Sequence, residues 1–188
     1  MPKIYILDVT NRDGVQTARL GLAKIEKTMV NFYLNEMGVY QSEFGFPTTR
    51  HETHYLNANL ELAEMGALSP IRLSGWLRAV KKDVELAYQM VPGLKYLNLS
   101  ISTSDQMIHS KFQEKMSRET VIKSMIEAVE TAKARGAQGI GINAEDASRS
   151  DIDYLIEFAL AGKEAGAERF RYCDTLGYDS PFSIYERI

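Results

Sequence analysis

The sequence predicts an α/β protein whose parallel strands curve into part of a barrel. Short apolar runs alternate six times with longer amphipathic segments, a pattern typical of parallel strands covered by helices. Polar residues follow each apolar run. Their even spread favours a barrel with one active face over a doubly wound sheet, which would gather them at one crevice. The predicted fold is therefore a (β/α)8 TIM barrel, of which residues 1–188 cover about the first six βα units as the N-terminal part of a single domain.

Each predicted strand is a short apolar run bounded by glycine, proline or polar residues. The six strands are expected at residues 4–7, 39–44, 71–73, 94–99, 139–142 and 170–173. The first strand and the sixth, with Phe170 and Tyr172, are expected to turn apolar side chains inward.

The helices are predicted from apolar spacing and capping residues. They are expected over residues 18–37, from about 56 to 66, over 78–90, and then after three serines. In the first, an apolar face against the core is expected from the spacing of Leu22, Ile25, Met29 and Phe32. Ser117 can cap the fourth helix, Ser150 paired with Asp153 the fifth, and Ser180 before Pro181 the sixth.

Charge and cysteine content exclude several classes of partner. The 22 Lys and Arg residues nearly balance the 25 Asp and Glu residues, which argues against a nucleic-acid or membrane-surface partner. Cys173 is the only cysteine, so no internal disulfide forms, and its place in a strand indicates an inert core thiol. No signal peptide or membrane-spanning run is visible, so we expect a cytoplasmic protein.

The segment Asp8–Gln16 holds the densest group of polar residues at a strand end. The carboxylate of Asp13 can bind a divalent cation through oxygen. The guanidinium of Arg12 can stabilise negative charge that develops on a substrate oxygen. A structural ion pair between these two neighbours is an equally open interpretation of these residues alone.

Five segments carry a family resemblance. Residues 8–16 match the pattern D-x-T-L-R-D-G-E-Q at six positions, with Asn11 and Val15 in place of the usual Leu and Glu. Residues 42–47, 98–105, 144–151 and 173–177 supply S-E-F-G-F-P, N-L-S-I-S-T-S-D, A-E-D-A-S-R-S-D and C-D-T-L-G in the expected order. Together they resemble the metal-dependent Claisen-condensing TIM barrels, which include isopropylmalate synthases, homocitrate synthases and their lyase relatives. Residues 76–79 and 104–107 lean toward the nitrogen-fixation type of homocitrate synthase.

The resemblance implies an acyltransferase that condenses acetyl-CoA with 2-oxoglutarate to homocitrate and then hydrolyses the thioester. A divalent metal, Mg, Mn or Zn, would act as Lewis acid. The implied metal ligand is Asp13, and the implied catalytic residues are Arg12, Glu43 and Glu145. The implied substrate-binding residues are Gln16, Arg78, Asn143 and Thr175.

Each of these roles has a structural alternative. Glu43 could be a solvated strand-end carboxylate and Glu145 a helix cap, while Arg78 could be a surface charge and Thr175 a turn residue. The three histidines, His51, His54 and His109, are interpreted as structural because they lie away from the predicted strand ends.

Other functions also stay open. An isopropylmalate or citramalate synthase would use another 2-oxo acid, and a non-catalytic subunit would instead stabilise a partner chain. Specificity depends on a few pocket contacts, so the sequence identifies neither the 2-oxo acid nor the metal.

The resembled family also uses a His-x-His pair on a seventh strand, and residues 1–188 contain none. We expect a further segment or a partner chain to supply this pair and the last two barrel units. A homo-oligomer is also expected. Unpaired strand edges and inward apolar side chains should leave residues 1–188 alone marginally stable, oligomeric or aggregated.

Overall fold

Six parallel strands lie in one curved sheet, in the order in which they occur along the chain. This arrangement comes from a computed structural model that describes residues 3–112 and 115–188. The strands are β1 (Leu7–Asp8), β2 (Gln41–Gly45), β3 (Arg72–Arg78), β4 (Tyr96–Ser102), β5 (Gly139–Glu145) and β6 (Arg169–Tyr172). Each pairs in parallel with the next. The predicted α/β fold, a parallel part-barrel, is confirmed.

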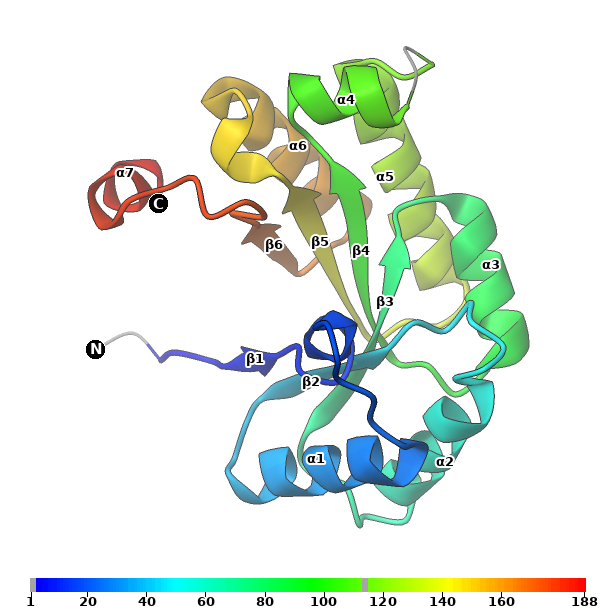
Figure 1. Cartoon of the computed structure of the whole chain (residues 1–188). Coiled ribbons are helices and arrows are strands. Elements are labelled where there is room, and N and C mark those ends of the chain that lie inside the picture. The colour runs from blue at the N-terminus through cyan, green and yellow to red at the C-terminus, as the bar shows by residue number, and fades with distance from the viewer. Residues whose placement is uncertain (1–2, 113–114) are drawn as a thin grey trace.

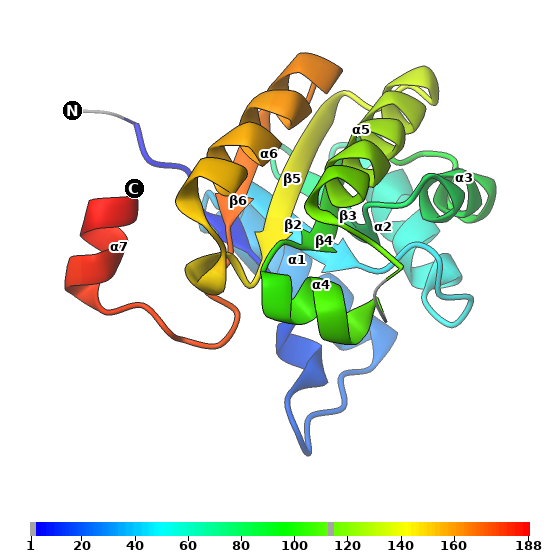
Figure 2. The ribbon, with the colours of Figure 1, turned by 90° about the horizontal axis from the view of Figure 1, so that it is seen from above.

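Helices cover the outer, convex face of the sheet (Figures 1 and 2). The covering helices are α1 (Lys24–Glu36), α2 (Thr53–Glu64), α3 (Lys81–Met90), α5 (Arg118–Ala134) and α6 (Ile152–Ala165). The described residues also form the helices α4 (Asp105–Lys111) and α7 (Pro181–Arg187) and the short 3-10 turns η1 (Gly14–Gln16) and η2 (Ala147–Arg149), and α7 stands apart from the sheet (Figure 1). The short helix α4 was not predicted, and it lies beyond the carboxyl end of β4 (Figure 1). Among the described residues, no helix combines the length and the apolar character that a membrane crossing requires.

Two of the three predicted serine caps are confirmed. Ser117 and Ser180 each accept a hydrogen bond from a backbone N–H in the first turn of the helix that follows. The cap of α6 is Asp151 and not Ser150. The Ser150 hydroxyl lies instead 2.8 Å from the Thr103 hydroxyl, which ties the loop after β5 to the end of β4.

The central strands run further than their apolar runs suggested. Strand β3 extends to Arg78 and β5 extends to Glu145. Both strands have a hydrogen-bonded neighbour on each side, which supports pairing past the last apolar residue. The third predicted helix was expected to start at residue 78. That start is wrong, because α3 begins only at Lys81.

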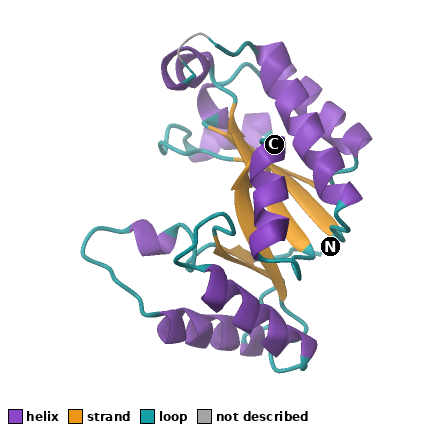
Figure 3. Cartoon of the chain, turned by 90° about the vertical axis from the view of Figure 1, so that its right-hand side faces the viewer, coloured by secondary structure: helices purple, strands orange, loops and turns teal. Residues whose placement is uncertain are grey.

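The core lies between the sheet and the helices (Figure 3). Alternate residues of β4 and β5, such as Leu97, Leu99 and Ile142, are buried against α5 and α6. Gly162 lets α6 approach β5, since an added Cβ would lie 2.2 Å from Ile142 Cδ1. Packing at this density fixes how the helices lie on the sheet.

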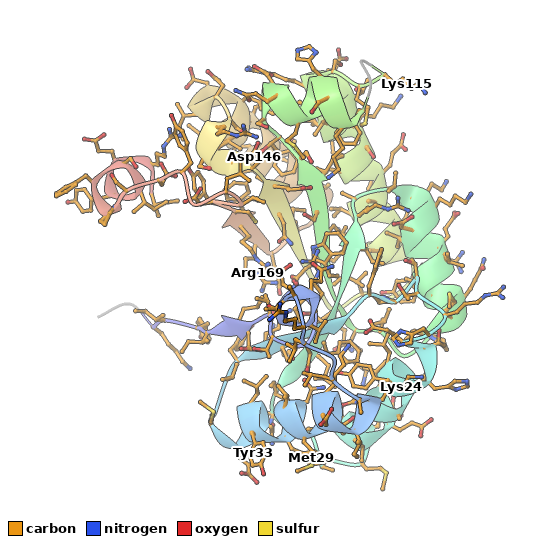
Figure 4. The ribbon with its side chains drawn as sticks, in the orientation of Figure 1. Lys24, Met29, Tyr33, Lys115, Asp146 and Arg169 are labelled. Carbon is orange, nitrogen blue, oxygen red and sulfur yellow. The ribbon has the colours of Figure 1, made fainter. Side chains whose placement is uncertain are left out.

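Helix α1 turns a partly polar face to the core, in place of most of the apolar face that its spacing predicted. Ile25 is 68% exposed and Met29 also lies at the surface, whereas Lys27 and Asn31 are buried. Figure 4 shows Met29 and Tyr33 on the outer side of α1. The prediction is wrong for Ile25 and Met29, whereas Phe32 does pack against the core. Amide hydrogen bonds hold the polar residues inward: Asn31 accepts from Ser42 and donates to Asn59, each at 2.9 Å.

The two edge strands also depart from expectation. Only Leu7 and Asp8 of the first strand pair with β2, and Ile4 is 86% exposed. In β6, Phe170 packs outward against Phe158 of α6, with ring centroids 6.3 Å apart. Its expected inward orientation is therefore wrong, because the alternation of side chains along a strand places its neighbours Arg169 and Arg171 inside.

Candidate active site

The loop after β1 presents its charged residues to the carboxyl end of the sheet. The Val9 carbonyl accepts the N–H groups of Arg12, Asp13 and Gly14 at 3.1, 2.8 and 3.2 Å. Three donors on one carbonyl make a tight turn. That turn places the two neighbouring charged side chains at the mouth of the part-barrel.

Asn11 anchors this loop from below. It is fully buried, and its amide donates to the Lys27 carbonyl at 2.8 Å and to Asn31 Oδ1 at 2.9 Å. The sequence showed Asn11 only as a departure from the Leu usual in the motif. That departure was the available signal, because an amide in place of a leucine requires polar partners when it is buried.

The guanidinium of Arg12 has three neighbours. Its central carbon lies 3.7 Å from the ring centre of Trp76, and its Nη1 donates to Asp13 Oδ1 at 2.6 Å. Its Nε lies 3.8 Å from Oε2 of Glu43. One face is therefore stacked, while the edge carries the charged contacts.

Glu43 lies beneath the mouth and is buried, with 1% of its side chain exposed. Its Oε1 accepts from Asn98 at 2.7 Å and from Arg171 at 3.1 Å. A single buried carboxylate thus faces the guanidiniums of both Arg12 and Arg171. Sequence reasoning missed Arg171, although the alternation of Arg169 and Arg171 in β6 was a readable signal.

The polar contacts around Glu43 and Asn98 continue to β6, at the far edge of the sheet. Arg169 donates to Asn98 Oδ1 at 2.7 Å, and it lies on the concave side in Figure 4. Burial, with the neighbouring charge of Arg171, lowers the pKa of Arg169. Gly141 leaves room for this contact, because an added Cβ would lie 2.6 Å from the Arg169 guanidinium and 2.7 Å from Asn98 Oδ1, so both side chains would have to shift.

Glu145 lies at the end of β5, where α4 approaches it. Lys111 donates to its two carboxylate oxygens at 3.0 and 2.8 Å, and Ser102 donates at 2.9 Å. Lys111 was missed because α4 itself carried no strong sequence signal. Glu145, a candidate for acid–base chemistry, therefore lies beside the ammonium group of Lys111.

A cavity of about 530 Å³, called the main cavity below, opens among these side chains. Six of the eight predicted site residues line it: Arg12, Asp13, Gln16, Asn143, Glu145 and Thr175. Asn143 is buried, and its Oδ1 has no hydrogen-bond partner among the described residues. A buried acceptor without a partner at a cavity wall suits a ligand that donates a hydrogen bond.

The seventh predicted residue, Arg78, borders a second opening of about 590 Å³, called the side cavity below. Arg12, Gln16 and Trp76 line both cavities. Arg78 donates to Asp83 at 2.7 and 2.8 Å, and this hydrogen-bonded pair raises its pKa. The eighth residue, Glu43, lies beneath the main cavity.

Two further residues bear on the earlier interpretations. His51 borders the side cavity and so lies nearer to Arg12 than the sequence suggested. Cys173 lines the main cavity, and burial raises the pKa of its thiol to about 11. The raised pKa favours the protonated thiol at neutral pH, which is a poorer nucleophile than the thiolate.

Asp146 positions Thr175 and joins three loops. Its backbone N–H donates to the Thr175 hydroxyl at 2.9 Å, and its carboxylate accepts from Ser104 and Arg149. Burial alone would raise the pKa of Asp146, but these side-chain hydrogen bonds hold it below its usual range. Figure 4 shows Asp146 in the loop after β5.

Replacing Asp146 with Asn should lower the free energy of unfolding at pH 7 by about 2 kcal/mol, the value of hydrogen bonds to a charged group. Asn tolerates the left-handed backbone at this position, where φ is +63°. A carboxyl whose pKa is lower in the folded state stabilises the protein above its unfolded pKa, about 3.9. This stabilisation is lost as the pH falls through the folded-state pKa.

Denaturant unfolding of wild type and Asp146→Asn at pH 7, 5 and 3 checks this. The difference should be constant from pH 7 to pH 5 and should shrink at pH 3. The exposed Asp153→Asn is the matched control. A difference that does not depend on pH would contradict the assigned role of the carboxylate.

A metal ligand role for Asp13 fits its position in part. Its carboxylate is 58% exposed at the mouth, and oxygen is the donor that hard divalent cations prefer. Within residues 3–112 and 115–188, no three His, Cys, Asp or Glu side chains gather closely enough to hold a metal. A cation at Asp13 would need ligands from elsewhere.

The chain resembles proteins of known sequence along almost its whole length. Residues 3–188 match the profile of the family described as HMGL-like. Citrate (Re)-synthase from Dehalococcoides mccartyi is 63% identical over 186 residues, and 2-isopropylmalate synthase 2 from Caldanaerobacter subterraneus is 43% identical over 185 residues. These alignments cover 99% and 98% of the chain but only 45% and 46% of the relatives, so the chain spans a little under half their length.

Among solved structures, an HMG-CoA lyase from Acenitobacter baumannii, in complex with coenzyme A and 3-methylmalate, superposes with a TM-score of 0.74. The match covers 97% of this chain and 60% of that one at 16% sequence identity. At that identity the likeness concerns the fold.

Proposed function

The chain belongs to the HMGL-like family, and from this premise we propose that it forms the N-terminal part of an acyltransferase barrel that condenses acetyl-CoA with a 2-oxo acid. The observation that carries the proposal is the placement of Arg12 beside Asp13 at the main cavity. A fixed guanidinium beside an oxygen donor for a cation suits a reaction that turns a ketone into an alkoxide.

In the proposed reaction, a base removes a proton from the methyl group of acetyl-CoA. The carbon then bonds to the ketone carbon, and the carbonyl electron pair moves onto oxygen. Water afterwards cleaves the thioester and releases CoA. A divalent cation, when bound, supplies Lewis-acid polarisation of the ketone.

The residues of this chain share the remaining work. Arg12 stabilises the alkoxide through its N–H donors, and Asp13 would contribute one oxygen ligand to the cation when it is bound. Glu145, paired with Lys111 at the cavity wall, moves a proton. The substrate is held by Gln16, Asn143 and Thr175 in the main cavity and by Arg78 at the side cavity.

Glu43 supports this arrangement from below. Its buried carboxylate faces Arg12 and Arg171, so its negative charge offsets the two guanidinium charges next to the main cavity. We assign it an indirect part in catalysis, through Arg12.

For the substrate, we propose oxaloacetate, with citrate as the product. The relative at 63% identity is a citrate (Re)-synthase, and the next is a 2-isopropylmalate synthase. The homocitrate interpretation drawn from residues 76–79 and 104–107 gains no specific support from these relatives. The isopropylmalate alternative is better supported, while neither relative is described as a non-catalytic subunit.

The test uses the complete gene product with acetyl-CoA, a divalent metal and one 2-oxo acid at a time. The panel contains oxaloacetate, 2-oxoglutarate, 2-oxoisovalerate and pyruvate, and free thiol and product mass are measured. We expect the highest kcat/KM with oxaloacetate and a product with the mass of citrate. A preference for 2-oxoisovalerate would replace citrate by isopropylmalate, and no thiol release with Mg, Mn or Zn would defeat the proposal.

A further inference from the structure

Trp76 occupies a wall that the two cavities share. It lies in β3, and with Arg12 and Gln16 it lines both the main and the side cavity. Phe46, which follows β2, packs edge-on against the indole at 5.2 Å with the rings 80° apart. The indole is therefore fixed on one side by Phe46 while it faces Arg12.

The guanidinium of Arg12 lies over the indole ring. The central carbon lies 3.7 Å from the centre of the indole, within the range of a cation–π interaction. At so short a distance an edge-on guanidinium would press its nitrogens against the ring, so we infer that its face is turned to the indole. All N–H bonds of a guanidinium lie in its plane. A stacked face thus orients the group without using any of its donors.

Neither of the two carboxylates beside Arg12 can orient its guanidinium in this way. Asp13 accepts a hydrogen bond from Nη1 of Arg12 at 2.6 Å. A divalent cation bound to Asp13 would compete with Arg12 for that carboxylate. Glu43 lies 3.8 Å from Nε, beyond hydrogen-bond distance, and its Oε1 already accepts from Asn98 and Arg171. Trp76 is the neighbour whose hold on Arg12 does not compete with the ligands.

We propose that Trp76 is the positioning residue for Arg12: its indole holds the guanidinium flat at the boundary of the two cavities, with the N–H edge directed for an anionic substrate oxygen. Phe46 keeps the indole in place. This inference rests on the proposed function for its kinetic test, whereas its spectroscopic test is independent of turnover.

The spectroscopic test uses 19F NMR of the complete protein labelled with 5-fluorotryptophan. The resonance that disappears in Trp76→Phe belongs to Trp76. This resonance should shift in Arg12→Gln, which removes the cation from the ring face, and in wild type when oxaloacetate is added. A Trp76 resonance at the same position in wild type and Arg12→Gln would overturn the stacked arrangement.

The kinetic test compares Trp76→Phe with Trp76→Leu. Phe keeps an aromatic face, whereas Leu keeps only apolar volume. Loss of orientation should lower kcat of Trp76→Leu roughly 10- to 100-fold, with KM for acetyl-CoA unchanged and with most of kcat retained in Trp76→Phe. Equal loss in both variants, or wild-type kcat in Trp76→Leu, would refute the positioning role.

The matched control is Tyr40→Leu. Tyr40 stacks on Arg72 at 4.6 Å, at the opposite end of the strands, so this variant removes a similar contact away from both cavities. It should lose stability without losing kcat, and a comparable fall in its kcat would count against the assignment. If wild type shows no turnover with any 2-oxo acid, the proposed function fails, and the NMR comparison alone decides the role of Trp76.

Discussion

Arg12→Lys is expected to lower kcat about 100- to 1000-fold, the usual effect of removing one donor from a developing oxyanion. Lysine keeps the positive charge but has no planar fork and no flat face. It can neither stack on Trp76 as the guanidinium does nor present several donors in one plane. The loss should therefore appear in turnover far more than in folding.

The measurement is kcat and KM of the complete protein with oxaloacetate and acetyl-CoA, alongside a thermal melt. Arg135→Lys is the matched control, because Arg135 is exposed at the end of α5. The control should match wild type in both assays. If Arg12→Lys keeps kcat within twofold of wild type, Arg12 has no part in stabilising the alkoxide.

Glu43→Gln should produce the largest loss of stability, about 3 kcal/mol. This is the lower end of the usual cost of removing one partner from a buried ion pair, because solvent reaches Arg171, which is 27% exposed. The amide keeps the shape and can still accept from Asn98. It leaves Arg12 and Arg171 without the carboxylate that faces both.

Urea unfolding at pH 7 checks this prediction. Glu127→Gln, at an exposed position on α5, is the matched control and should change the free energy of unfolding by less than about 0.5 kcal/mol. The double variant Glu43→Gln/Arg171→Met should recover part of the loss, since it removes one of the unpaired charges together with its partner. Strict additivity of the two single changes would show that no coupling links these residues.

The sequence by itself determined the order of the elements and indicated the candidate site. Alternating apolar runs and amphipathic segments predicted six parallel strands with helices between them, and the structure has that order. The position of Arg12 and Asp13 after β1 was also predicted. Both follow from local causes, because capping, turn formation and strand alternation depend on residues close together in the chain.

Tertiary structure decided which face each element turns inward. Helix α1 buries Lys27 and Asn31 in place of Ile25 and Met29, because Glu52 pairs with Lys27 and amides from other segments bond Asn31. Strand β6 turns Arg169 and Arg171 inward, because its register against β5 sets which side of the sheet each residue occupies. A one-residue slip in register would exchange the two sides.

Tertiary structure also decided how the site is held. Arg12 meets Trp76 across 64 positions of sequence, and Glu43 meets Arg171 across 128. No local pattern encodes such pairs, since they form only when the strands curve toward one another. Local sequence therefore predicted which groups are candidates for the chemistry, and the curvature of the sheet decided which of them touch.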